Sequence, residues 1–153
     1  MAIFYSKKVL KHFTEPRYYG KMKNPDGRGK VGNPVCGDVL EIYLKIGKKP
    51  KKQGDYIKDI SFQTLGCCAA IAVSDALCDL AKGKAIENAL KIKNNEIVNS
   101  LGGLPAIKYH CSLLGVDALW EAIYDYLNKN KKPIPENLKL RHRQLKKENH
   151  RNH

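Results

Sequence analysis

The chain has 153 residues, 42% of them hydrophobic and 28% charged, which fits one globular domain and excludes wholesale disorder. No stretch approaches the length of a membrane span, and the first residues lack the apolar core of a secretory signal, so a cytoplasmic protein is predicted. The net charge of +13 is concentrated in residues 131–153 and in a lysine-rich loop at residues 48–55, a distribution typical of solvated, mobile segments.

The first predicted element is a short amphipathic helix. Ser6 is a suitable N-cap, and the apolar residues Val9, Leu10 and Phe13 that follow it share one helical face. Residues 16–34 are rich in glycine and proline and show no clear periodicity. An irregular segment is therefore expected after the helix.

Two strands are predicted next. In residues 39–46 every second residue is apolar, as in a strand with one buried face, and residues 56–65 repeat this alternation less regularly. The lysine-rich loop is the short connection between them, which favours an antiparallel pair.

The remainder of the sequence is typical of helices. A helix is predicted over residues 67–82 with Gly83 as its C-terminal stop, followed by two short helices, the second capped by Asn94 or Asn95. Pro105 suits the first turn of a long helix that ends near residue 130. The fold class is therefore α+β, a small antiparallel sheet with helices on one side, and the predicted division is a domain at 1–130 and a basic C-terminal tail at 131–153.

Three of the five cysteines lie at the ends of predicted elements. Cys36 lies in a Gly/Pro-bounded turn before the first strand, Cys67 at a strand–helix junction, and Cys111 near the start of the last long helix. Side chains at element ends can converge on one site, and thiolates are preferred ligands of soft metals and iron–sulfur clusters. The odd number of cysteines in a chain without an export signal argues against a disulfide framework.

The other two cysteines are interpreted differently. Cys78 lies within a helix and is expected to be a buried, small apolar residue. Cys68 is turned about 100° from Cys67 by helical geometry, so Cys67 is favoured as the ligand and Cys68 as its neighbour. The same divergence between Cys111 and His110 opposes a nucleophile–base pair, so a cysteine hydrolase is not predicted.

Five stretches of the sequence together resemble a known family. In chain order they are YSKKVLKHF, GNPVCGDVL, FQTLGCCAAIAVSDAL, KGKAIENALKIKNNEI and LPAIKYHCSLLGVDALWEAI. Over about residues 4–128 they resemble the IscU/NifU N-terminal family of iron–sulfur cluster assembly scaffolds. The resemblance implies a three-stranded antiparallel sheet with packed helices. It also implies a scaffold rather than an enzyme, on which a [2Fe–2S] cluster is built with sulfur from a cysteine desulfurase and passed to apo iron–sulfur proteins, with a homodimer around the cluster as one arrangement.

The resemblance also assigns the site residues by position. The cluster cysteines are Cys36, Cys67 and Cys111, and the alternative fourth ligands are Asp38 and His110. We favour Asp38, because it shares a turn with Cys36 and its carboxylate can swing onto iron with little backbone change.

Two further residues modulate this assignment. Lys108 lies where the family has a lysine near the site. Cys68 stands where many members have a small residue without a thiol, so it is a candidate for an extra sulfur acceptor or a substitute ligand.

Two other functions compete with the cluster scaffold. The first is a zinc-binding sulfur acceptor, in which the same residues hold Zn²⁺ tetrahedrally. The second is a nucleic-acid-binding module that uses the basic tail, but the tail lacks interleaved aromatic residues and the cysteine spacing fits no zinc-finger pattern. The cluster scaffold is therefore the favoured prediction.

Overall fold

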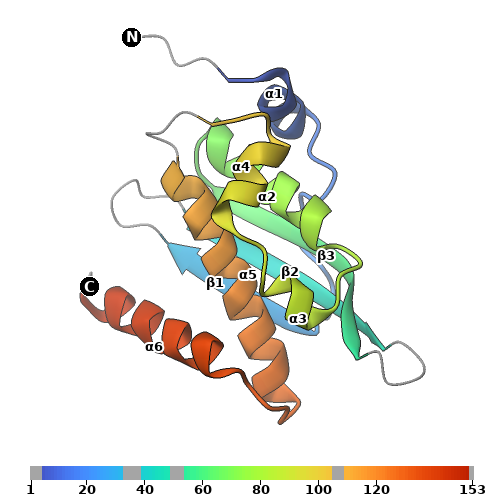
Figure 1. The fold of residues 1–153 in the computed structure, drawn as a ribbon, viewed down its shortest axis with the longest axis vertical. Coiled ribbons are helices and arrows are strands. Elements are labelled where there is room, and N and C mark those ends of the chain that lie inside the picture. The colour runs from blue at the N-terminus through green and yellow to red at the C-terminus, as the bar shows by residue number, and fades with distance from the viewer. Residues whose placement is uncertain (1–4, 33–38, 49–53, 105–108, 152–153) are drawn as a thin grey trace.

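The computed structural model describes residues 5–32, 39–48, 54–104 and 109–151, apart from the side chains at 109, 110 and 149–151. The strands are β1 (Gly27–Gly32), β2 (Val39–Lys48) and β3 (Asp55–Leu65). The helices are α1 (Lys7–Thr14), α2 (Cys68–Ala81), α3 (Ile86–Ala89), α4 (Asn94–Ser100), α5 (Tyr109–Lys129) and α6 (Glu136–Arg151). In Figure 1, α2 and α5 lie across one face of the sheet, so the predicted α+β class is confirmed.

The sheet has the order β1-β2-β3 with both pairs antiparallel, which confirms the predicted pairing of β2 with β3. The register between these two strands shifts after Lys45, which pairs with Asp59, whereas Ile46 pairs with Ile57. One extra residue of β3 therefore lies between the two pairs, and this bulge lets Ile57 and Ile60 both point into the core. The bulge explains why the alternation in this strand is irregular.

β1 lies within the segment that was expected to be irregular, so that expectation was wrong. Two of its three inward positions are Gly27 and Gly29, which give no hydrophobic signal, and the third is Val31. A Cβ atom on Gly27 would lie 2.4 Å from the carbonyl oxygen of Ala122, and one on Gly29 would lie 2.3 Å from the Ala122 nitrogen. The glycines are therefore required because the backbone of α5 packs directly on β1.

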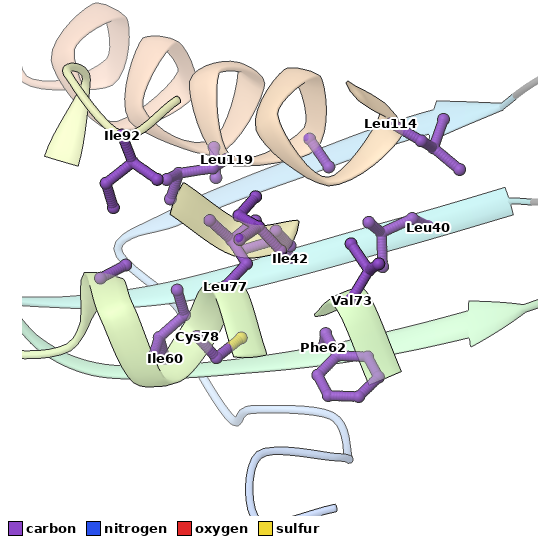
Figure 2. Close-up of a cluster of buried hydrophobic side chains, with 14 of the residues drawn as sticks. Leu40, Ile42, Ile60, Phe62, Val73, Leu77, Cys78, Ile92, Leu114 and Leu119 are labelled. Carbon is purple, nitrogen blue, oxygen red and sulfur yellow. The ribbon is translucent and has the colours of Figure 1, made fainter. Parts of the chain in front are cut away.

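The core lies between the sheet and helices α2 and α5. In Figure 2, Leu40, Ile42, Ile60 and Phe62 of the strands face Val73 and Leu77 of α2, with Leu119 of α5 beside them, and all seven are buried. Much of the buried face of α2 is alanine (residues 69, 70, 72, 76 and 81). Small side chains let this helix lie close to its neighbours.

α1 follows its prediction only in part. Ser6 is the N-cap, and its side chain accepts a hydrogen bond from the backbone nitrogen of Val9. Val9 is fully buried, but Leu10 and Phe13 remain exposed. The helix therefore inserts one anchor into the core and leaves the rest of its apolar face uncovered within the described chain.

The observed C-terminal end of α2 matches the sequence prediction, but the N-cap of α4 does not. Gly83 follows α2 with φ +86°, the left-handed conformation that favours glycine. The N-cap of α4 is Lys93 and not Asn94 or Asn95. The side chain of Asn94 instead accepts a hydrogen bond from the hydroxyl of Ser112, which joins α4 to α5.

The basic tail is a helix packed on the domain, so the expected mobile segment was wrong. Figure 1 shows α6 alongside α5, and its Leu138 and Leu145 are buried. The ring of His142 stacks on Tyr124 of α5 at 3.7 Å between centroids, and its Nδ1 lies 2.7 Å from the carboxylate of Glu121. Within the described ranges, no helix combines the length and apolar character needed to cross a membrane.

Candidate metal–sulfur site

Cys67 lies at the junction between β3 and α2, as the sequence predicted. Its backbone is extended, with φ −78° and ψ 175°, and it is the N-cap of α2, so its carbonyl accepts the first helical hydrogen bond from Ile71. The thiol side chain does not cap the helix in a hydrogen bond. Cys67 is half-buried and can be approached from solvent.

Cys111 is the third residue of α5, and it is only 1% exposed. The start of this helix is fixed by the contact between Ser112 and Asn94 of α4. One turn further on, a Cβ added at Gly115 would lie only 3.2 Å from Leu77 and 3.4 Å from Val73, so α5 packs closely on α2 here. The first turns of α5 are therefore held against both neighbouring helices, which fixes the position of the Cys111 side chain.

The structure brings these two cysteines together across 44 residues of chain, with their sulfur atoms 3.9 Å apart. Two thiolates bound to one tetrahedral metal atom, with metal–sulfur bonds of about 2.3 Å, lie about 3.8 Å apart. The observed separation therefore suits two ligands of the same metal atom without movement of either helix.

The other two described cysteines, Cys68 and Cys78, occupy different positions in α2. Cys78 lies in the core beside Ile60 (Figure 2), and burial raises the pKa of its thiol well above 9.0, so its predicted burial is confirmed. Cys68 is the first residue of α2 and is half-buried. It follows Cys67 directly in the chain. Its backbone is helical, however, whereas that of Cys67 is the extended N-cap of the same helix.

The other predicted site residues cannot be placed in this way. Cys36, Asp38 and Lys108 lie outside the described residues, as does the side chain of His110. Among the described side chains, no group of three His, Cys, Asp or Glu is arranged to hold a metal ion. The described part of the site is thus the pair formed by Cys67 and Cys111.

Two exposed leucines flank the pair. Leu65 precedes Cys67 by two residues and is 79% exposed, and Leu113 follows Cys111 by two residues and is also exposed. Both side chains are close in sequence to a thiol and are accessible to another molecule.

Asp75 attaches the N-terminal segment to α2, the helix that begins directly after Cys67, and the sequence interpretation missed this contact. Its carboxylate is buried in α2 and accepts hydrogen bonds from the backbone nitrogens of Arg17 and Tyr18, while His12 Nδ1 lies 2.6 Å away. These contacts attach α1 and the segment after it to α2. The available signal was an acidic residue at a helical position flanked by apolar residues, in the stretch AVSDAL.

One turn further along α2, Asp79 continues this attachment. The hydroxyl of Tyr18 donates a hydrogen bond to Asp79 at 2.9 Å. Burial, reinforced by this hydrogen bond, raises the pKa of Tyr18 to about 12. The phenol is therefore a stable donor throughout the physiological pH range.

With this geometry established, the comparisons with known proteins identify the family. The NifU-like N-terminal domain matches residues 4–133. The chain belongs to this family. The match ends before α6, so that helix lies outside the part of the chain that defines family membership.

Relatives in this NifU-like family carry consistent names. The chain is 52% identical over 128 residues to "Iron-sulfur cluster assembly scaffold protein IscU 1" of Archaeoglobus fulgidus, covering 84% of this chain and 80% of the relative. It is 45% identical over 133 residues to the IscU scaffold protein of Rickettsia prowazekii, covering 84% and 97%. A solved N-terminal structure of a NifU-like protein from Brucella abortus has a TM-score of 0.59 at 20% identity, covering 81% of this chain and 94% of that one, and supports the fold.

Proposed function

We propose that this chain is a scaffold on which a [2Fe–2S] cluster is assembled and from which the cluster is passed to apo-proteins. The observation that carries the proposal is the 3.9 Å separation of the Cys67 and Cys111 sulfurs, which suits two ligands of one metal atom. The naming of the relatives as iron–sulfur cluster assembly scaffolds supports the same role.

The proposal divides the ligands between two irons, and the closeness of Cys67 and Cys111 supports one half of this division. Cys67 and Cys111 together bind one iron, and Cys36 with Asp38, which share a short stretch of chain, bind the other. Thiolate is well suited to iron in a cluster, whereas a carboxylate is a harder and less suited ligand. The iron bound by Asp38 should therefore be released more readily than the other. A scaffold needs such a weaker ligand because it must give up its cluster.

The surface around the thiols fits the partners of such a scaffold. Leu65 and Leu113 are exposed apolar side chains beside the site, where a sulfur donor such as a cysteine desulfurase, or an apo-protein that accepts the cluster, would make contact. A second copy of the chain could share the cluster through the same face. Lys108 adds a positive charge near the anionic cluster.

Anaerobic reconstitution tests the proposal directly. The protein with iron and sulfide should acquire a red-brown chromophore, with iron and sulfide in equal amounts. Cys36→Ser, Cys67→Ser and Cys111→Ser should each abolish or greatly weaken it, while Cys78→Ala should retain it. Purification of the reduced protein with stoichiometric zinc, and no chromophore on reconstitution, would instead favour the zinc-binding sulfur acceptor.

A second measurement separates the two candidates for the fourth ligand. If Asp38 binds iron, Asp38→Ala should change the spectrum of the loaded protein and the rate of transfer to an apo-ferredoxin, whereas His110→Ala should leave the spectrum unchanged. Nitrogen couplings in the reduced cluster that are lost in His110→Ala would assign the role to His110.

A further inference from the structure

We propose that the outer face of α6 is a docking surface for an acidic protein that receives the cluster. The surface consists of four residues that we call the basic stripe, Lys139, Arg143, Lys146 and Lys147. The last three follow the first by four, seven and eight residues, so all four share one face of the helix. The inference rests on the proposed function, because it assigns a binding surface to the recipient of the cluster.

α6 divides its residues between packing and solvent. Leu138 and Leu145 are buried, and Arg141 pairs with Asp117 of α5 at 2.6 Å. The basic stripe lies on a different side of the helix, where all four side chains are exposed. The stripe is therefore not needed to hold α6 on the domain and is accessible to another molecule.

The positive charge of the stripe has little local compensation. Among the described residues, no carboxylate forms an ion pair with Arg143, Lys146 or Lys147. Lys139 lies 3.8 Å from Glu136, but that carboxylate is 86% exposed, and ion pairs so exposed contribute little. The stripe therefore attracts a negatively charged surface over a Debye length, which is about 8–10 Å at physiological salt.

A lysine of β1 extends this positive surface onto the sheet. Lys30 is exposed on β1, and it lines a small hollow between β1 and α6 together with Lys146 of the stripe. The hollow also contains Glu121 and Glu148, but each of these carboxylates is already in an ion pair with a residue of α6. The surface available to a partner therefore runs from α6 to the edge strand.

This surface lies near the proposed cluster ligands. Gly32, the last residue of β1, lines the same hollow and precedes Cys36 by four residues, and Figure 1 shows the C-terminal end of α6 beside this end of β1. Arg141 pairs with Asp117, which is six residues, or about 9 Å along α5, from Cys111. A protein interface of ordinary size covers about 800 Å² on each partner, or roughly 30 Å across. A recipient bound to the stripe can therefore also contact the cluster.

The surroundings of the stripe favour a protein over a membrane or a nucleic acid. The leucines that an amphipathic helix would insert into a membrane, Leu138 and Leu145, are buried in the domain. α6 contains no Phe, Tyr or Trp on which a base could stack. Leu140 is 54% exposed and lies one turn before Arg143, so an apolar side chain borders the cations, as in protein interfaces. The expected partner therefore presents carboxylates around an apolar contact.

The test measures the initial rate of cluster transfer from the reconstituted full chain to an acidic apo-ferredoxin, normalised to cluster content. The stripe variant combines Arg143→Glu, Lys146→Glu and Lys147→Glu. The matched control has the same net charge but changes three exposed lysines outside α6, by Lys58→Glu, Lys84→Glu and Lys91→Glu.

At low ionic strength, transfer from the stripe variant should be about tenfold slower than from the wild type, because the charges that steer the encounter are reversed. Transfer from the control should fall by no more than about twofold. In about 0.5 M salt the three proteins should transfer at similar rates, because salt screens the attraction. The salt dependence is measured on the wild type as well, so this readout does not depend on the folding of a variant.

Three results would overturn the inference. They are transfer from the wild type that does not depend on salt, equal slowing in the stripe variant and the control, and stripe-dependent binding of duplex DNA or RNA at about 150 mM salt with transfer unaffected. Reconstitution with iron and inorganic sulfide separates this inference from the proposed function. A wild type that forms no cluster would reject the scaffold, whereas a cluster whose transfer ignores the stripe would reject only the docking surface.

Discussion

Arg141 of α6 donates two parallel hydrogen bonds to Asp117 of α5, from Nε to Oδ1 at 2.8 Å and from Nη2 to Oδ2 at 2.6 Å. Both donors belong to one planar guanidinium, so the pair fixes the rotation of α6 as well as its position. The hydrogen bond to Asp117 is the main reason that the pKa of Arg141 is raised. The basic C-terminal helix is therefore joined to the domain at a defined register.

Removal of the buried contacts of α6 should lower stability. Leu138→Ala should cost about 2–5 kcal/mol of unfolding free energy, because Leu138 is 1% exposed. Leu140→Ala is the matched control, since Leu140 is 54% exposed and its loss should cost no more than about 0.5 kcal/mol. Chemical denaturation of both variants measures the difference, and equal midpoints would show that α6 does not stabilise the domain.

Asp55 should make stability depend on pH in the acid range. Burial alone would raise its pKa, but hydrogen bonds from Lys132 and Tyr126 outweigh burial and hold the pKa of Asp55 below 3.8. The contribution of Asp55 to folding stability is therefore fully present above about pH 3.8. It is lost as the pH falls through the lower pKa that Asp55 has in the folded state.

Asp55→Asn should therefore be less stable than the wild type at about pH 7, and this difference in unfolding free energy should be smaller at about pH 3. Urea denaturation of both proteins at both pH values measures the difference. The exposed Asp59 on the same strand provides the control, since Asp59→Asn should show a small gap at either pH. A constant gap for Asp55→Asn would contradict the assignment.

Gly29 should tolerate no side chain. A Cβ at this position would lie 2.3 Å and 2.4 Å from backbone atoms of Ala122 and Ala118, which cannot move aside as a side chain could. Gly29→Ala should cost about 1–3 kcal/mol or more and displace α5 from β1. Lys30→Ala, at the next and exposed position, should have little effect in the same thermal unfolding measurement.

Cys78 should be inert toward alkylation in the native protein. Burial, followed by the negative charges of Asp75 and Asp59, raises its pKa well above 9.0, so the thiolate that reacts is absent at neutral and mildly alkaline pH. Iodoacetamide followed by peptide mass analysis should modify Cys67 first and Cys78 only after denaturation. Early modification of Cys78 would mean that α2 opens readily.

The sequence was sufficient to predict elements whose signal is local. The alternating residues of β2 predicted a half-buried strand, and the cysteine after Gly66 predicted the strand–helix junction that the structure contains. The residue pattern missed β1 because two of its three inward residues are glycines, whose role depends on how closely α5 approaches. The packing of α6 was missed because its two buried leucines are surrounded by charged residues that also occur in mobile tails.

The site shows the same division between local and distant information. The sequence predicted that Cys67 and Cys111 belong to one site, but not how close their sulfurs lie, because the 3.9 Å contact joins residues 44 apart and depends on the packing of α2 against α5. Asp75 was missed as a support because its partners lie in α1 and in the segment after it, about 60 residues away along the chain.

The outer edge of β3 is paired by the chain's own N-terminal segment. Phe62 donates a backbone hydrogen bond to Tyr18 at 2.9 Å, and Gly20 donates one to Phe62 at 2.8 Å. Asp75 holds this segment through Tyr18, so detachment of α1 would uncover backbone donors and acceptors that another molecule could use for strand addition. One buried carboxylate in α2 thus protects the chain against self-association along a sheet edge that it does not itself touch.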